Sequence, residues 1–222
     1  MKSKTKLFLT ILLFCSFGAM AQVPVSQEPS HHPVFQNQYI RLLDVTLNPG
    51  DTTQFHIHAT PSLFLHLSNT NVSSQIMGKE WVKDRNETGK AWYKSFSPEI
   101  LVHRVTNCDT VLFHVTDLEI LSSFDTTTVS PYKHLPFDLL FENEKAVAYG
   151  ITNKNIMQKV AKNRGPLLAE LATGDEVFFH NAETRQSKEI KTGHYLYIDP
   201  GTPFYFTGSD KSEIKMVLFE IK

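Results

Sequence analysis

Three histidines in this chain of 222 residues have the spacing of a metal site. His56 and His58 are two residues apart in the segment 48–58, and residues two apart on a strand point to the same face. His103 follows in a second segment, 98–107. Three imidazoles on the inner wall of a barrel suit Fe, Zn, Cu or Ni and leave coordination positions open for water or substrate. We therefore predict a metal site, against the alternative of three histidines that are separately satisfied by hydrogen bonds.

The segments around these histidines are short apolar or alternating runs, interrupted by Gly, Asn, Asp and Pro. Such runs are typical of strands in a sandwich or barrel. We expect strands over residues 40–47, 54–58, 63–67, 100–105 and 110–115, and a second series over 146–151, 167–171, 176–180, 195–198 and 215–221. Residues 117–123 and 155–162 are the only helix candidates, and neither has a convincing helical period. The sequence therefore predicts an all-β protein.

The two series of strands look like copies of one unit. Phe35-Gln-Asn37 recurs as Phe141-Glu-Asn143, and residues 60–72 align with residues 165–177 at a shift of 105. A repeat of about 100 residues is the size of a small domain, so each copy would form a complete barrel. Apolar alternation alone also produces partial matches, but the shared features keep the same order in both halves. We predict two tandem barrels.

The first 21 residues have the order of a secretory signal peptide. Lys2, Lys4 and Lys6 precede an apolar run over residues 7–20, which ends in the triplet Ala19-Met-Ala21. The run is shorter than the roughly 20 apolar residues of a membrane span. We therefore expect an exported protein, periplasmic or secreted, with no stable membrane insertion once the signal is cleaved.

The rest of the chain has an ordinary globular composition. Aromatic residues make up 11%, and 22 Lys and Arg stand against 23 Asp and Glu, so the chain is neither disordered nor basic enough to bind a nucleic-acid backbone. Removal of the signal takes three lysines and leaves a formal charge of −4. It also removes Cys15, so Cys108 cannot form an intrachain disulfide. The fold must therefore be held by its core or by a metal.

The spacing of the histidines and their flanking residues resembles the two signature motifs of the cupin superfamily. The matching positions are Gly50, His56 and His58 in the first motif and Pro98, His103 and Asn107 in the second. The resemblance implies double-stranded β-helix barrels, the RmlC-like jelly roll, that hold a metal on three histidines and usually one glutamate. Together with the repeat it implies a bicupin over residues 35–222. Cupins often dimerise, which makes a homodimer a candidate assembly.

The resemblance divides the chain into five parts. We expect a signal peptide (1–21), an N-terminal lead (22–34), a metal-binding cupin barrel (35–122), a linker (123–140) and a degenerate cupin barrel (141–222). The lead contains His31 and His32. We expect both to belong to a disordered segment, with loose metal binding as the alternative.

The chain departs from the cupin pattern in both copies. In the first copy, the position of the family's glutamate is Ser62. In the second copy, the ligand positions are Ala161, Asn163, Leu167 and Phe204, and of these only Asn163 is even a weak metal ligand. We therefore expect a metal in the first barrel and a structural second barrel without one.

Loss of the glutamate changes the charge at the metal. Three neutral imidazoles leave the full +2 charge of a divalent ion uncompensated, so the open positions should favour an anionic ligand. The resemblance supplies a precedent, because thiol dioxygenases in the superfamily use a histidine-only triad, whereas flavonol dioxygenases keep the glutamate as a base. The cofactor we expect is a divalent transition metal, with Fe(II) favoured over Zn, Ni, Cu or Mn.

Four further residues are candidates for roles near the metal. Ser62 cannot act as the base, and His66 shares a strand face with Ser62, which makes His66 a candidate base. A hydrogen-bonded structural histidine is the simpler interpretation of His66. Gln54 should face the interior together with His56, and Asn107 is a candidate to do so from the other strand. Gln54, Ser62 and Asn107 are thus candidates to orient a ligand or to bond the imidazole N–H groups.

Aromatic residues lie in the long insertion between the two motifs. Trp81, Trp92 and Tyr93 occupy the part of the chain where a lid or a pocket wall would form. Packing between the barrels, or over an open end, is an equally good interpretation.

Two functions fit these residues. The first is a metal-dependent oxidoreductase, dioxygenase-like, that acts on a small anionic or phenolic compound; lyase or isomerase chemistry fits the same site. The second is a non-enzymatic cupin that binds a small ligand or a metal. Both imply a small-molecule partner, and the sequence does not choose between them because a fold does not establish an activity.

Overall fold

The computed structural model describes residues 22–125, 133–156, 159–209 and 211–222. The expected signal peptide and part of the expected linker lie outside these residues. Within the described ranges the regular elements are strands, apart from one 3-10 turn, η1 (Val25–Gln27), which confirms the all-β prediction. No helix in this part of the chain is long and apolar enough to cross a membrane.

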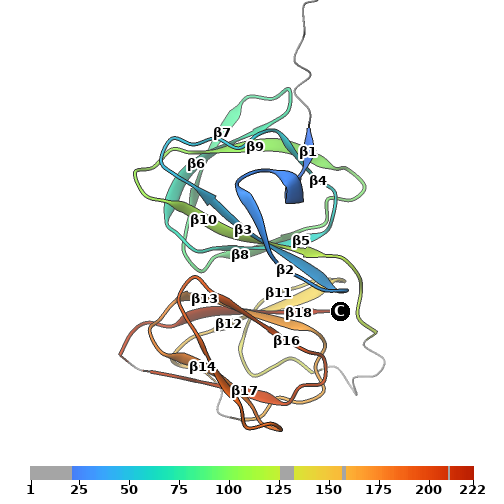
Figure 1. Ribbon diagram of the computed structural model, residues 1–222, viewed down its shortest axis with the longest axis vertical. Coiled ribbons are helices and arrows are strands. Elements are labelled where there is room, and N and C mark those ends of the chain that lie inside the picture. The colour runs from blue at the N-terminus through green and yellow to red at the C-terminus, as the bar shows by residue number, and fades with distance from the viewer. Residues whose placement is uncertain (1–21, 126–132, 157–158, 210) are drawn as a thin grey trace, which may run out of the picture.

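The first barrel is made of two five-stranded sheets (Figure 1). One sheet has the order β1 (Val23–Pro24), β4 (His56–His58), β9 (Leu101–Asn107), β6 (Thr70–Ile76) and β7 (Trp81–Asn86). The other has the order β2 (His31–Gln36), β3 (Ile40–Leu47), β10 (Phe113–Ile120), β5 (Ser62–His66) and β8 (Ala91–Lys94). Neighbouring strands in both sheets are antiparallel except β1 and β4, which are parallel.

The second barrel repeats this plan with fewer strands. Its larger sheet has the order β11 (Asp138–Glu142), β12 (Ala146–Ile151), β18 (Lys215–Ile221), β13 (Leu167–Thr173) and β16 (Tyr195–Ile198). Its smaller sheet has the order β15 (Ser187–Ile190), β14 (Val177–Asn181) and β17 (Phe204–Gly208). The two barrels lie one above the other along the long axis of the molecule in Figure 1. This is the predicted tandem arrangement.

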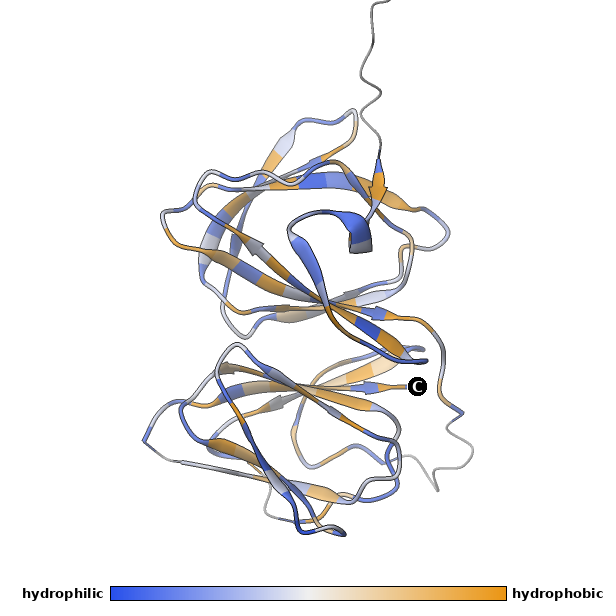
Figure 2. Cartoon of the chain, viewed as in Figure 1, coloured by the Kyte–Doolittle hydropathy of each residue, from blue (hydrophilic) through white to orange (hydrophobic). Residues whose placement is uncertain are grey.

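The larger sheet of the second barrel packs face to face on the β2-β3-β10-β5-β8 sheet of the first (Figure 1). Side chains alternate along these strands, so each strand supplies one row to its own barrel and one row to the junction; the ribbons in Figure 2 accordingly change between orange and blue along their length. The junction rows form one apolar core: Ile40, Leu42, Leu63, Leu65, Leu118, Ile120, Ala146, Ala148, Leu168, Val217, Phe219 and Ile221.

The repeat seen in the sequence has a structural counterpart in the turns before β3 and β12. The side chain of Asn37 accepts hydrogen bonds of 2.8 and 3.0 Å from the backbone amides two and three residues later. The side chain of Asn143 makes the same two bonds, also of 2.8 and 3.0 Å. Equivalent asparagines therefore set the same turn at the start of the same strand in each barrel.

The interiors of the two barrels differ. The second is filled by a cluster of 18 buried apolar residues, which includes Tyr149, Phe204 and Phe206. The corresponding cluster of the first barrel has nine: Val25, Leu43, Val45, Leu47, Phe64, Val72, Phe96, Phe113 and Val115. Among the described residues, the first barrel therefore has less apolar filling and more room.

The structure differs from the sequence predictions at some element boundaries. The strand expected over residues 110–115 begins at Phe113 and continues to Ile120, so the first helix candidate is part of β10. The described part of the second candidate, residues 155–156 and 159–162, contains no helix either. At the N-terminus, residues 23–24 and 31–36 are strands of the first barrel, so this segment is an ordered part of the fold.

Candidate metal centre

The structure brings His56, His58 and His103 together on paired strands of one sheet, where they line a cavity of the first barrel. His56 is directly opposite His103 in the antiparallel pair of β4 and β9. The ring centroids of His56 and His103 are 4.6 Å apart, and the ring of His58 is 5.0 Å from each of them. The side chains of residues 56 and 58 on one strand and of residue 103 on the neighbouring strand therefore face a common point, as the strand period predicted.

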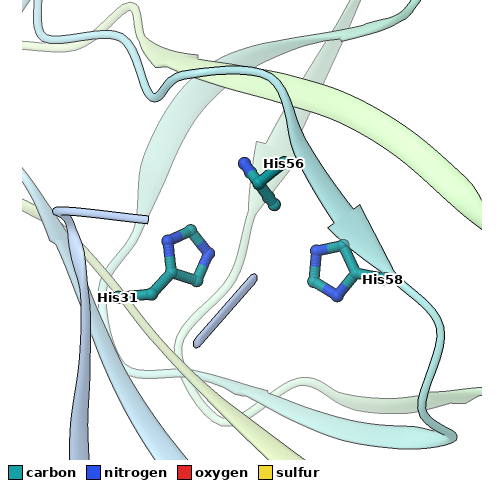
Figure 3. A group of neighbouring side chains, drawn as sticks. All are labelled: His31, His56 and His58. Carbon is teal, nitrogen blue, oxygen red and sulfur yellow. The ribbon is translucent and has the colours of Figure 1, made fainter. Parts of the chain in front are cut away.

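A fourth histidine, His31, joins this group. It lies at the start of β2, is only 7% exposed, and its ring centroid is 4.6 Å from that of His56. One nitrogen from each of His31, His56 and His58 lies within 4.8 Å of the other two. Figure 3 shows the ring of His31 pointing towards the other two rings from a separate strand. Our expectation that His31 belongs to a disordered lead is therefore wrong.

The N-terminal segment is ordered because it pairs with the strand that carries the histidines. Val23 is the partner of His56 in the parallel pair of β1 and β4. Downstream, the buried carboxylate of Glu28 lies 2.7 Å from Nδ1 of His31 and accepts a hydrogen bond of 3.1 Å from the backbone amide of Gln54. Burial alone would raise the pKa of Glu28, but these hydrogen bonds and one from the amide of Ser30 hold it below its ordinary value. An ionised carboxylate thus fixes His31 beside the strand.

The imidazole of His56 is held in one tautomer. Its Nδ1 lies 2.9 Å from the backbone carbonyl oxygen of Gln54, which can only accept a hydrogen bond, so Nδ1 carries the proton. Nε2 is then an acceptor, and it is buried without a hydrogen-bond partner. The side chain of Gln54 itself is exposed. The expectation that it faces the interior is wrong because residues 53–55 precede the regular strand; Gln54 acts through its backbone.

His58 is positioned by packing. The ring of Phe96 stacks on it with centroids 4.8 Å apart and an angle of 17° between the planes. Its Nδ1 lies 3.4 Å from Oδ2 of Asp117, a buried carboxyl group on β10. Burial, with the nearby charge of Glu119, raises the pKa of Asp117 well above its ordinary value, so this neighbour is a carboxylic acid group and not a carboxylate.

The histidines of β4 and β9 are neutral at pH 7. Burial, followed by the nearby charge of His31, lowers the pKa of His56 to about 4. Burial, followed by charge on His56, His31 and Lys94, lowers the pKa of His103 to about 3. Burial also places the pKa of His58 far below its ordinary value. Neutral imidazole is the form that binds a metal ion.

A cavity of about 470 Å³ adjoins the histidines. This volume is within the range of small-molecule sites. Much of its wall is apolar and includes Val45, Phe64, Val72, Phe96, Phe113 and Val115. Its polar wall includes His66, Asp84, Lys90 and Lys94. The histidines therefore lie in a chamber large enough for a small organic molecule, with basic side chains at its rim.

The other residues singled out from the sequence have different positions. Ser62 is fully buried on β5 and donates a hydrogen bond of 3.1 Å to the carbonyl of Thr60. The amide of Asn107 donates to two backbone carbonyls, those of Leu47 at 3.0 Å and Val111 at 2.8 Å. Neither side chain lines the cavity. Asn107 therefore fixes a loop, and the expectation that it faces the interior of the site is wrong.

His66 and Trp92 both line the cavity. Nε1 of Trp92 donates a hydrogen bond of 3.4 Å to Nε2 of His66. Trp92 also stacks on Phe64 with ring centroids 4.0 Å apart. Of the alternatives for the aromatic insertion, a pocket wall is correct for Trp92. Trp81 lies outside, with the guanidinium of Arg104 4.8 Å from its ring, and Tyr93 packs at the junction of the barrels.

The second barrel has no histidine group at the equivalent place. Ala161 and Phe204 form an isolated antiparallel bridge, which corresponds to the pair of His56 and His103 in the first barrel. Phe204 is fully buried in the apolar core, and Asn163 is exposed. The described residues of this barrel thus carry two apolar side chains, Ala161 and Phe204, and one exposed amide, Asn163, where the first barrel carries imidazoles.

Comparison with known proteins identifies the fold. No protein-family model matches the sequence, and no curated protein matches it significantly. Protein Ylba from E. coli has a similar structure, with 10% identity, a TM-score of 0.58, and 86% of this chain and 87% of that chain covered. A cupin 2 conserved barrel domain protein from Leptotrichia buccalis is also similar in structure. Its identity is 13% and its TM-score is 0.53, with 86% of this chain and 88% of that chain covered.

A third similar structure is a mutant of salicylate 1,2-dioxygenase from Pseudoaminobacter salicylatoxidans in complex with gentisate. Its identity is 7% and its TM-score 0.55, with 82% of this chain and 69% of that chain covered. At such identities the likeness concerns the fold alone. The chain therefore has the cupin jelly-roll fold over most of its length, as the motifs implied.

Proposed function

We propose that the first barrel is a mononuclear centre for a divalent transition metal, held by His56, His58, His103 and His31, and that the protein is a metal-dependent oxidoreductase. Its substrate is a small anionic or phenolic compound that enters the cavity beside the histidines. The second barrel supports the first by packing and holds no metal.

One observation carries this proposal: the environment of Nε2 of His56. This atom is an acceptor, because Nδ1 is occupied by the carbonyl of Gln54, and it is buried without a partner. An unpaired buried polar atom is unfavourable and calls for a partner. The rings of three further histidines, His31, His58 and His103, have centroids 4.6–5.0 Å from that of His56, and a cation held among them would give this nitrogen its partner.

The protein's own residues prepare this donor set. Glu28 orients His31, the carbonyl of Gln54 fixes the tautomer of His56, and the ring of Phe96 holds the plane of His58. Such outer contacts fix ligand geometry before a metal arrives. A bound divalent ion would supply a Lewis-acid charge and, if redox-active, electron transfer; Fe(II) is our first choice, with Zn, Ni, Cu and Mn as alternatives.

The charge around the centre supports an anionic ligand. None of the four imidazoles carries negative charge, and Ser62 replaces the acidic ligand, so the charge of a metal would not be neutralised by the donors. The ammonium group of Lys94 lies close enough to lower the pKa of both His58 and His103. The apolar part of the cavity wall would accommodate an unsaturated or aromatic body and exclude water.

A second candidate function is binding without catalysis. Ser62 cannot accept a proton as the glutamate of other cupins does, and the acceptor nitrogen of His66 is occupied by Trp92. A site that lacks the glutamate base of the family is also suited to holding a ligand or a metal without turnover. Turnover measurements separate this candidate from the first.

We also propose that the chain is exported. The support is the charge and hydropathy order of residues 1–21. Mass spectrometry of the protein recovered from its host should give an N-terminus at Gln22. An intact Met1 in the recovered protein would contradict export by this route.

The decisive experiment is metal analysis of purified protein without residues 1–21. We expect about one equivalent of transition metal in the parent, loss of it in His103→Ala, and no change in His32→Ala, because His32 is exposed. An equally low content in all three would contradict the metal centre. Oxygen uptake by the metal-loaded parent with gentisate, catechols, thiols and 2-oxo acids then tests turnover; uptake with none of them would favour the binding function.

A further inference from the structure

His66 is a buried polar residue that lines the cavity, although it is not one of the four histidines of the metal centre. It is 8% exposed and ends strand β5. It is connected to the centre by a run of aromatic contacts: Phe64 lies 6.0 Å from His58 and 4.0 Å from Trp92, and Trp92 bonds to His66. His66 is thus across an aromatic wall from the metal centre, in the same cavity.

The hydrogen bond from Trp92 determines which nitrogen of His66 carries the proton. An indole N–H can only donate, so Nε2 of His66 accepts and Nδ1 must be the protonated nitrogen of the neutral ring. The ring is neutral because burial, assisted by the charge of Lys90, lowers its pKa to about 4, against a smaller opposing effect of Asp84. Trp92 cannot easily turn away, since it is stacked on Phe64 at an interplanar angle of 12°.

The protonated nitrogen has no partner within the protein. Nδ1 of His66 is buried and makes no hydrogen bond. A buried N–H without an acceptor is costly, and a ligand oxygen bound in the adjoining cavity would supply the missing acceptor. Because Nε2 accepts the hydrogen bond from Trp92, the unsatisfied nitrogen of the neutral ring is a donor and not an acceptor.

We propose that Nδ1–H of His66 is a ligand-recognition donor, which binds an oxygen acceptor on the end of the ligand that lies away from the metal centre. This inference rests on the proposed function for the other end of the ligand, where the histidines and Lys94 take an anionic group. The ligand class is therefore a small, largely apolar carboxylate or phenolate that carries a second acceptor oxygen, such as a ketone or a second carboxylate. His66 is a specificity-determining residue here and does not act as a general base.

Matched probes test the acceptor directly. We would measure by calorimetry the binding of 3- and 4-acetylbenzoate and of the corresponding isopropylbenzoates to zinc-loaded protein. The two members of each pair have nearly the same size and the same carboxylate, and only the acetyl compound has a second acceptor group, its ketone oxygen. We expect at least one acetyl compound to bind about tenfold more tightly than its isopropyl partner, the size of one well-placed hydrogen bond.

Variants assign the discrimination to His66. In His66→Leu the preference for acetyl should fall to about onefold, whereas His66→Asn, which keeps an amide donor near the position of Nδ1, should retain part of it. Equal binding of both probes by the parent, absence of binding, or a preference that survives in His66→Leu would overturn the proposal. Thermal unfolding of each variant checks that it is folded.

The tautomer can be measured without any ligand. A long-range ¹H–¹⁵N correlation spectrum should show His66 protonated at Nδ1, and Trp92→Phe should shift it towards a mixture of tautomers. Protonation of Nε2 in the parent would also overturn the proposal. Metal content is measured on the same samples. If the protein binds no metal but shows this tautomer and the acetyl preference, only the proposed function is refuted. If the protein binds metal but shows neither the tautomer nor the preference, only the present inference is refuted.

Discussion

In both barrels an equivalent pair of residues lies opposite each other on neighbouring strands, but the side chains are polar in the first barrel and apolar in the second. In the first barrel the pair is His56 and His103, and in the second it is Ala161 and Phe204. Phe204 is completely buried in an apolar cluster, whereas His103 borders a cavity of about 470 Å³. The interior of a jelly-roll barrel can thus be filled by apolar side chains or can keep a cavity beside a group of polar side chains. The difference is made by a few inward-facing side chains on a shared backbone plan.

The two barrels also differ in the side chains that they contribute to the junction between them. Leu65 and Glu170 occupy corresponding positions in the repeat, and both face the junction. Leu65 belongs to the apolar core between the barrels, and Glu170 is a carboxyl group with 1% exposure beside Thr116. Burial, with a further contribution from Asp44, raises the pKa of Glu170 to about 8. The second barrel thus contributes a protonated acid to the interface at neutral pH.

The largest expected effects on stability and on metal binding come from alanine substitutions at the two equivalent positions, 204 and 103. Phe204→Ala should lower the free energy of unfolding by about 3–5 kcal/mol, because it leaves a void in a filled core, and should not change metal content. His103→Ala should change the stability of the metal-free protein by less than about 1 kcal/mol and should abolish metal binding. Denaturant unfolding and metal analysis of both variants measure these effects. Loss of metal in Phe204→Ala, or a large loss of stability in metal-free His103→Ala, would contradict the proposed difference between the barrels.

The next largest effect is the dependence of stability on pH at Glu170. Its unfolded form ionises near 4.5 and its folded form near 8, so the unfolded state binds fewer protons between these values and stability falls as pH rises through this window. The loss between pH 5 and 8 should be on the order of 3 kcal/mol. Denaturant unfolding of Glu170→Gln should lack this loss; parallel curves for parent and variant would show that Glu170 is ionised in the folded protein.

Within the first barrel, His31 separates a three-histidine from a four-histidine centre. His31→Ala should weaken metal binding by about tenfold to a hundredfold without abolishing it, because three imidazole ligands would still hold the ion. The matched control is His32→Ala, one residue away and exposed, which should bind metal as the parent does. Competition with a chelator measures both affinities. Equal affinity of His31→Ala and the parent would reduce the centre to the three histidines expected from the sequence.

The smallest expected effect concerns the carboxylate behind His31. Glu28→Gln should weaken metal binding by about tenfold, since it removes the charge that orients the imidazole. The second barrel offers a matched control in Glu142, which lies 2.8 Å from Nε2 of His134 on the surface. Glu142→Gln should leave the metal affinity unchanged. A similar loss in both variants would point to a general effect of charge on the whole protein.

The sequence was sufficient for the fold and for part of the site because both depend on the strand period. Alternation in residues 40–47 or 215–221 is a local signal of a strand, and the short spacing between His56 and His58 fixes their common face wherever the strand lies. The pairing of His103 with them followed from the resemblance to a known family of barrels and agrees with the strand register.

The missed parts of the site depend on contacts between distant residues. Residues 22–36 have no periodic pattern and contain Pro24, Pro29 and Pro33. They are ordered by the pairing of β1 with β4 and by the bonds of Glu28. The only local signal for His31 is an acidic residue three positions before it. The side chain of Gln54 was placed wrongly for the converse reason, since strand alternation was extended beyond the first residue of β4.

The most direct test of the central claim is anomalous diffraction from crystals of the metal-loaded protein, with data collected at the absorption edge of the bound metal. We predict one strong peak per chain in the first barrel, about 2.0–2.2 Å from a ring nitrogen of each of His31, His56, His58 and His103. No peak is expected at Ala161 and Phe204. A peak in the second barrel, or none near the four histidines, would contradict the assignment of the metal centre to the first barrel.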